Sequence, residues 1–481
     1  MIGVEETKSS RRVPSGDDGQ TFGAWFSKFS GHLFVAAVAV ICLFSPSVPF
    51  WTGVAFVLVA YVLADFVRNC SNGIQLVDAT LLIAGVQWFI IAHFVYLSPN
   101  ASDSIHTMQL DESTYMFNTL IAYVGYWAGM KLFAPKVIWR EYESRTSEMF
   151  WDIALAIGVV LFAANFVFPS FVTQLGVWII IGYLLKNICY TPPKTMYIWA
   201  LVAVDVYVFI QSIISSMFHQ LLLMLLMQML FIAVIRKIPG KKLCLIIFVG
   251  LMLINVLQIS KNEYRAVMDN YSVVDRLEAF HKLFWDNMQD MFSPDDDLEE
   301  YPLGRYNQGW LISHVYTFMD GRFHSENLSK FKDSLLAIAL PRFLMPGKRQ
   351  AGGKDNINDF TDLTLTENTS MNISTVGEGY AYFGRYGNFI FHFLIGGIFA
   401  GVLHLLMHWE RVYGVGVFCI PAIFSLSIRA ESDFVTGYNA LFKTLLLFAL
   451  LLWYSNSRVQ KKGLLDVDDG YFDNDPGGVL K

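Results

Sequence analysis

The stretch Thr375–Gly397, TVGEGYAYFGRYGNFIFHFLIGG, changes character halfway along its length. Its first half contains glycines and tyrosines, the acid Glu378 and the base Arg385, whereas its second half is apolar enough to enter a bilayer. The sequence therefore predicts a polar, aromatic and glycine-rich cluster directly at the mouth of a membrane-spanning segment.

The composition of the whole chain agrees with a membrane protein. Of its 481 residues 54% are hydrophobic and 16% are charged, and the mean hydropathy is +0.43. Soluble domains carry about 25% charged residues, so we expect an all-α polytopic membrane protein. A net charge of −6 gives no reason to expect a nucleic-acid partner. The first thirty residues lack an early apolar core, which argues against a cleavable signal peptide.

Twelve segments approach the length of about 20 apolar residues that a spanning helix needs. They cover 31–48, 51–67, 75–97, 114–134, 149–168, 170–186, 196–214, 217–235, 242–260, 386–408, 412–428 and 436–455. The two closely joined pairs, 149–186 and 196–235, could each instead form a broken or re-entrant unit. This pattern divides the chain into a tail 1–30, nine spans in 31–260, an outer loop 261–385, three spans in 386–457 and an acidic, disordered tail 458–481.

Lysines and arginines set the predicted orientation. They concentrate in the termini and in every second connection, whereas the short connections on the other side hold only Arg429. Because basic residues stay on the cytoplasmic side, both termini are predicted to face the cytoplasm.

The long segment 261–385 is predicted to lie on the outer side, since long loops cross the membrane largely regardless of their charge. Connections of this length usually carry function. Within it, Ser329–Arg349 is predicted to contain an amphipathic helix on the membrane surface, stopped by Pro341 and Pro346, and Gly352–Ser370 a polar, mobile stretch.

Two basic clusters in this loop suit a phosphate or diphosphate group. Lys261 and Arg265 lie where the ninth predicted span ends, and Arg342, Lys348 and Arg349 follow the amphipathic helix. Arginine offers a bidentate fork and lysine a point charge to such an anion. The alternatives are snorkelling of the first cluster and a solvated basic patch for the second.

The quoted stretch itself supplies a candidate acid and candidate sugar-binding aromatics. Glu378 is suited to accept a proton from a sugar hydroxyl, or it simply pairs with Arg385 or with another cation of the loop. Tyr380 and Tyr382 could stack on sugar rings, or belong to the aromatic belt of the bilayer interface. Two further basic residues on the same side, Arg305 and Arg429, are candidates for substrate binding.

No cofactor or metal is expected. The five cysteines show no CxxC spacing. The acidic run in Ser293–Gly304 lacks the spacing of an EF-hand loop, and no Walker A motif is present.

The predicted spans, the single large outer loop, SKNEYR at its start and STVGEGYAYFGRYG at its end together resemble the Wzy-type O-antigen and exopolysaccharide repeat-unit polymerases. The departure from that family's pattern is AYFG, where NFG is more typical, at Tyr382. The resemblance implies a GT-C-like integral glycosyltransferase of the bacterial inner membrane with a large periplasmic loop.

The resemblance also implies a particular reaction, a glycosyl transfer from a lipid-linked donor. The enzyme would join oligosaccharide repeats carried on undecaprenyl diphosphate at the periplasmic face, without a cofactor, and a chain-length regulator protein is a further expected partner. Glu378 and Arg265 would be catalytic. The substrate-binding residues would be Lys261, Arg305, Arg342, Lys348, Arg349, Tyr380, Tyr382, Arg385 and Arg429.

Two other functions stay open at this point. An O-antigen ligase uses a similar lipid-diphosphate donor but transfers it once, to a different acceptor. A flippase or other glycolipid transporter would also need many spans, although the chain shows no inverted halves of the kind common in transporters.

Overall fold

The computed structural model describes most of the chain as helices. The described residues are 22–97, 107–138, 144–164, 170–189, 195–215, 218–240, 273–290, 307–322, 325–340, 353–365 and 371–472, with scattered residues of 242–260 and 344–349. No strand occurs among them. The all-helical class predicted from the sequence is therefore confirmed.

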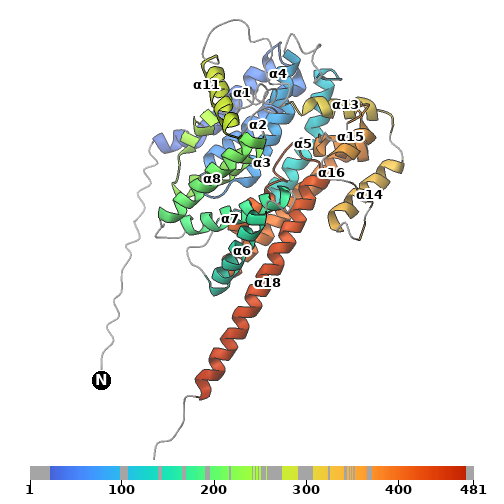
Figure 1. Ribbon diagram of the computed structural model, residues 1–481. Coiled ribbons are helices and arrows are strands. Elements are labelled where there is room, and N and C mark those ends of the chain that lie inside the picture. The colour runs from blue at the N-terminus through green and yellow to red at the C-terminus, as the bar shows by residue number, and fades with distance from the viewer. Residues whose placement is uncertain are drawn as a thin grey trace, which may run out of the picture.

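The helices form one bundle with a group of loop helices at one end. In the first half lie α1 (Phe22–Phe44), α2 (Phe50–Asn69), α3 (Leu76–Gly85), the π-helix η1 (Val86–Ile90), α4 (Ile91–Leu97), α5 (Glu112–Phe133), α6 (Arg145–Ala163), α7 (Ser170–Cys189), α8 (Thr195–Ser215) and α9 (His219–Ile235). In the second half lie α11 (Val273–Asp290), α13 (Gly309–Met319), α14 (Ser325–Ala339), α15 (Lys354–Phe360), α16 (Ser374–Tyr413), the 3₁₀ helix η4 (Val417–Cys419), α17 (Ile420–Phe424) and α18 (Phe434–Phe472). Helices α13, α14 and α15 gather beside the start of α16, at the opposite end of the bundle from α6, and α18 runs well past its neighbours (Figure 1).

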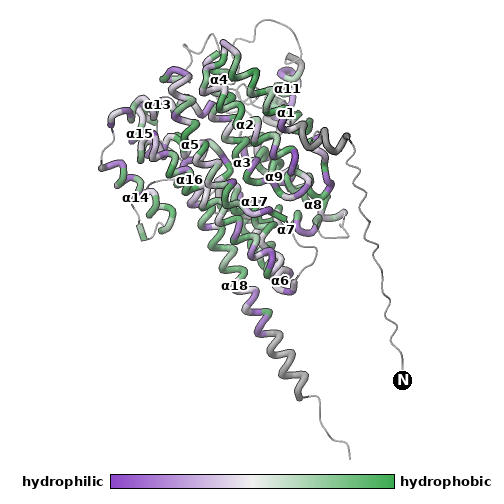
Figure 2. The backbone as a smooth tube through the Cα atoms, turned by 180° about the vertical axis from the view of Figure 1, so that it is seen from behind, coloured by the Kyte–Doolittle hydropathy of each residue, from purple (hydrophilic) through white to green (hydrophobic). Residues whose placement is uncertain are grey.

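Seven of the described helices are long and apolar enough to cross a membrane. They are Phe50–Asn69, Leu76–Leu97, Arg145–Ala163, Val172–Cys189, Thr195–Ser215, Ser374–Tyr413 and Phe434–Lys461. Figure 2 shows hydrophobic residues following α2, α5, α16 and the first part of α18, with more hydrophilic residues in α14 and α15. The length and hydropathy of these helices thus identify the chain as a membrane protein.

The expected count of twelve spans is not confirmed. Segments 31–48 and 217–235 correspond to the shorter apolar helices Gly31–Phe44 and His219–Ile235. The predicted span 114–134 is α5, whose many small, polar and aromatic residues lower its hydropathy. Most of 242–260 lies outside the described residues, and 412–428 is not a continuous helix.

The segment that follows α16 still returns through the bundle, but as a broken chain. It holds only η4 and α17, and almost every residue from Gly414 to Asp433 is buried. Phe424 packs on Phe399 of α16 with ring centroids 4.4 Å apart, and Phe434 packs on Phe391 at 5.3 Å. The chain therefore runs antiparallel to the spanning arm of α16, and α18 then runs back in the opposite direction.

Helix α16 is a hairpin rather than a straight span. Gly384 has φ 70° and ψ −176°, a conformation that is essentially restricted to glycine. Across this break the Asn388 side chain donates to the Val376 carbonyl at 3.1 Å, although residues 12 apart in a straight helix are separated by about 18 Å. His392 Nε2 likewise meets Thr375 Oγ1 at 3.3 Å.

This hairpin corrects the predicted boundary at residue 386. The glycine- and tyrosine-rich half of the quoted stretch is not loop but the first arm of α16, which begins at Ser374 and folds back on the spanning arm. The glycines of this half allow the two arms of α16 to pack closely, since a Cβ at Gly379 would overlap the Asn388 side chain.

Helices α5 and α16 approach until their backbones touch. Gly125 and Gly129 form a GxxxG pair on α5, of the kind that packs membrane helices closely. A Cβ at either position would overlap a carbonyl oxygen of α16, that of Phe389 or Phe393 respectively, and a Cβ at Gly396 would lie 2.7 Å from the Tyr126 carbonyl oxygen. This contact fixes the position of the spanning arm of α16.

Replacing Gly129 with alanine is expected to destabilise the protein. The added methyl group must push α5 away from α16, which costs roughly 1–3 kcal/mol of unfolding free energy. The measurement is denaturant unfolding of the purified protein in detergent. Gly401→Ala is the matched control, because nothing lies within 4 Å of a Cβ there, and equal losses in the two variants would contradict the assigned contact.

Candidate functional site

Glu378 lies on the first arm of the α16 hairpin, and its side chain is completely buried. Its Oε1 accepts hydrogen bonds from Asn356 Nδ2 at 2.6 Å and from the Tyr382 hydroxyl at 3.2 Å. Its Oε2 accepts a short hydrogen bond from the backbone N–H of Phe434. The carboxyl group thus joins α15, α16 and the start of α18.

Asn356 connects Glu378 to a charged network formed by α14, α15 and the segment between them. Its Oδ1 accepts from Arg349 Nη2 at 2.8 Å while its Nδ2 donates to Glu378. Arg349 also pairs with Asp359 at 2.7 Å, and Lys330 of α14 pairs with the other oxygen of Asp359 at 3.0 Å. The carboxyl group of Glu378 is therefore separated from a fixed guanidinium by a single amide.

Asp433 is a second buried acid next to Glu378. Its Oδ2 lies 3.5 Å from Asn356 Nδ2, and its Oδ1 accepts from the backbone N–H of Thr436 at 2.6 Å, which caps the start of α18. Burial raises the pKa of Asp433, and the hydrogen bonds from Thr436 oppose that rise. The amide of Asn356 accordingly faces two carboxyl groups and one guanidinium.

The two tyrosines predicted to stack on sugars are packed into the interior. Tyr382 is 3% exposed and its hydroxyl also meets Ser334 Oγ of α14 at 3.0 Å. Tyr380 is 4% exposed and its ring lies 4.5 Å from that of Tyr316. A sugar could reach either ring only after these helices move apart.

Helix α14 covers this cluster. Phe331 packs on the rings of Phe383 and Tyr382 at centroid distances of 4.8 Å and 5.4 Å. Leu328 and Leu335, three positions before and four positions after Phe331 on the helix, are exposed. The helix begins at Ser325, four residues before the segment expected to be amphipathic, and ends before Pro341. Its apolar stripe thus closes the site through Phe331 and leaves the leucines beside Phe331 exposed.

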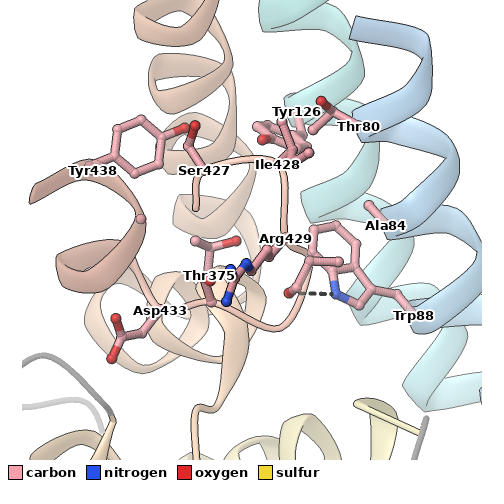
Figure 3. Close-up of a pocket in the computed structure, with 13 residues that line it drawn as sticks. Thr80, Ala84, Trp88, Tyr126, Thr375, Ser427, Ile428, Arg429, Asp433 and Tyr438 are labelled. Atoms are coloured by element: carbon pink, nitrogen blue, oxygen red, sulfur yellow. Dashed lines mark hydrogen bonds between the residues drawn. The ribbon is translucent and has the colours of Figure 1, made fainter. Parts of the chain in front are cut away.

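Arg429 lies beside the cluster rather than inside it. It lines a small cavity of about 10 Å³, together with Trp88, Thr375 and Asp433, which is room for about one water molecule. Figure 3 shows its guanidinium extending toward Thr375, with Trp88 donating to the Ala430 carbonyl nearby. Arg429 Nε has no hydrogen-bond partner among the described residues.

Arg385 does not pair with Glu378. Its guanidinium lies over the ring of Phe117 at 5.6 Å, on the far side of the Gly384 break. The predicted alternative of a Glu378–Arg385 pair is therefore not found among the interactions of the described side chains.

The structure brings together Glu378, Tyr382 and Arg349 of the predicted site residues, with Arg429 adjacent. Five others lie outside the described residues, and they are Lys261, Arg265, Arg305, Arg342 and Lys348. In the part of the chain that is described, no group of three or more His, Cys, Asp or Glu side chains is placed to hold a metal ion.

Sequence reasoning missed Asn356 and Asp433. Asn356 lies in the stretch expected to be mobile, which instead contains α15 and is anchored by the buried side chains of Ile357 and Phe360. Their spacing of three residues was the available signal. Asp433 directly precedes an apolar run, a typical helix N-cap position.

Replacing Asn356 with alanine is expected to lower the free energy of unfolding by about 2–4 kcal/mol, because the buried Glu378 and the partly buried Arg349 lose a hydrogen-bond partner at once. Thermal unfolding in detergent measures this loss. Asn358→Ala, two residues away on the exposed side of α15, controls for helix propensity. A similar midpoint for both variants would show that the network contributes little.

Comparisons of this chain with protein-family models, with curated proteins and with solved structures give no match.

Proposed function

We propose that this protein is an integral membrane glycosyltransferase that polymerises oligosaccharide repeat units carried on undecaprenyl diphosphate. The observation that carries the proposal is the buried Glu378 carboxylate, held by Tyr382 and Asn356 with Arg349 directly behind, at the folded-back start of a membrane-spanning helix. A carboxylate and fixed guanidinium groups at a membrane boundary are what transfer from a lipid diphosphate requires.

The chemistry needs two kinds of group. The hydroxyl oxygen of the acceptor sugar forms a bond to the anomeric carbon of the donor, and the bond from that carbon to the diphosphate oxygen breaks. A carboxylate receives the hydroxyl proton, which is the role proposed for Glu378. Guanidinium groups stabilise the departing diphosphate, which is the role proposed for Arg349 and Arg429, and for Arg265 among the residues outside the described part.

Access to Glu378 is part of the proposal. In the described arrangement α14 closes over Tyr382 through Ser334 and Phe331. The exposed leucines of α14 suit contact with lipid, so displacement of α14 would open Glu378 toward the bilayer surface, where both lipid-linked substrates reside. The GT-C-like fold, the twelve spans, the periplasmic loop and a bacterial inner-membrane location with cytoplasmic termini belong to the same proposal.

The test of the acid is complementation of a strain lacking this chain, read as the ladder of repeat units on a gel. The native sequence is expected to restore a full ladder and Glu378→Gln to leave a single repeat, because the amide cannot accept the hydroxyl proton. Glu326→Gln, an exposed acid on α14, is the control. Protein level and unfolding midpoint are measured for each variant, since Glu378 also holds the fold together.

The outcome in the null strain separates the functions. A single repeat there supports a polymerase. Complete loss of surface glycan favours a ligase or a flippase, and an unchanged ladder contradicts the proposal.

The test of the cation uses Arg429→Gln in the same assay, with purified protein and lipid-linked repeats as the quantitative version. The rate of chain extension is expected to fall about a hundredfold, the size of effect seen when one preorganised transition-state donor is removed. Arg429→Lys should recover part of the rate. Arg322→Gln is the control, because Arg322 is exposed and stacks on Phe318. An unchanged rate in Arg429→Gln would remove this residue from the mechanism.

A further inference from the structure

A second cavity lies at the opposite end of α16 from Glu378. It has a volume of about 600 Å³ and is formed by the last turns of α16 and by the chain that follows α5. The rise of a helix places His404 about 30 Å along the spanning arm from Gly384. The cavity is therefore separate from the site around Glu378, and the proposed glycosyl transfer has no use for it.

Four basic side chains line this cavity. Lys136 comes from the segment after α5, and His404, His408 and Arg411 come from α16. His404 and His408 are one helical turn apart and share a face. All four are exposed, so their charged or polar ends are available to a ligand.

The one acid in the lining is already engaged. Glu410 is buried, and its Oε2 accepts a hydrogen bond from the backbone N–H of Val417 at 3.1 Å, which holds the start of η4. The cavity consequently presents lysine, arginine and imidazole groups against an acid that is held by the backbone.

The surface around the cavity is apolar. Leu132 is 69% exposed and Phe133 is 49% exposed on the last turn of α5, just before the lining residue Pro135. Leu405 and Val412 are exposed on α16 between and beyond the basic residues. A ligand held here would meet cations at its head and hydrocarbon along its sides.

We propose that this cavity binds the phosphate headgroup of an anionic phospholipid. Arg411 supplies a bidentate fork and Lys136 a point charge for the phosphate, and the exposed leucine and phenylalanine side chains accompany the acyl chains. Basic cavities between membrane helices on the cytoplasmic side are suited to anionic headgroups, and Lys136 and Arg411 both belong to segments predicted from their charge to face the cytoplasm. A free phosphate offers the same anionic chemistry without the acyl chains.

The experiment uses the delipidated full-length protein in detergent and follows its thermal-unfolding midpoint during lipid titration. Dioleoyl phosphatidylglycerol is expected to raise the midpoint with saturation, whereas dioleoyl phosphatidylcholine is not. The double variant Lys136→Gln/Arg411→Gln should bind phosphatidylglycerol at least about tenfold more weakly, because two charge-assisted contacts are lost. Arg458→Gln/Lys461→Gln, which removes the same charge from exposed positions on α18, should keep the native affinity.

The remaining outcomes decide between sources of the phosphate. Glycerol 3-phosphate, which is the headgroup without acyl chains, should fail to raise the midpoint at concentrations where the lipid saturates. Protection by glycerol 3-phosphate equal to that by the lipid would overturn the lipid as the ligand, and equal lipid affinity in the native protein and the Lys136/Arg411 variant would overturn the site. Should that variant fail to fold, His404→Gln/His408→Gln takes its place with a weaker but measurable loss expected.

Discussion

The carboxyl group of Glu378 is the constraint on which the end of the bundle beside α13, α14 and α15 depends. Burying a charged group away from water is costly unless it is fully hydrogen-bonded, and here the bonds come from three parts of the chain that are far apart in sequence. Asn356 brings α15, Tyr382 belongs to the first arm of α16, and the backbone N–H of Phe434 belongs to the start of α18. Satisfying one acid therefore fixes the relative positions of α15, α16 and α18. A residue in such a position can serve both the fold and the chemistry, because the same contacts that stabilise it also orient it.

Glycines determine how α5 and the two arms of α16 pack against one another. The reversal at Gly384 turns the first arm of α16 back on the second, and the pair Gly125 and Gly129 lets α5 reach the backbone of the spanning arm. Without a hydrophobic driving force between helices in lipid, such close van der Waals contact is a main source of association. The position of Glu378 thus follows from a rigid α5–α16 pair on one side and from a polar network on the other.

The all-helical membrane class followed directly from the sequence, because runs such as 51–67 and 436–455 have no other stable solution than a helix in lipid. Glu378 and Arg349 were identified as site residues because an acid and a base at a membrane boundary are unusual enough to notice. The hairpin at Gly384 was not predicted, since a glycine in a tyrosine-rich stretch has the same sequence signature in a loop as in a sharply folded helix. Asn356 and Asp433 were not predicted either, because their importance comes from contacts between residues that are far apart along the chain. Asn356 bonds to Glu378, 22 positions away, and Asp433 meets Asn356, 77 positions away. Local patterns carry no information about such pairs.

The broken segment between α16 and α18 also bears on how the protein is made. Its helical pieces are three and five residues long, far shorter than a segment that can enter a bilayer alone. Its interruptions are tolerated where it is buried, and the hydroxyls of Ser425 and Ser427 bond to the carbonyls of Ala422 and Phe424. In lipid, exposed irregular backbone of this kind is not stable. The segment consequently depends on α16 and α18 being present together. The C-terminal part of the chain must therefore insert into the membrane as one unit rather than helix by helix.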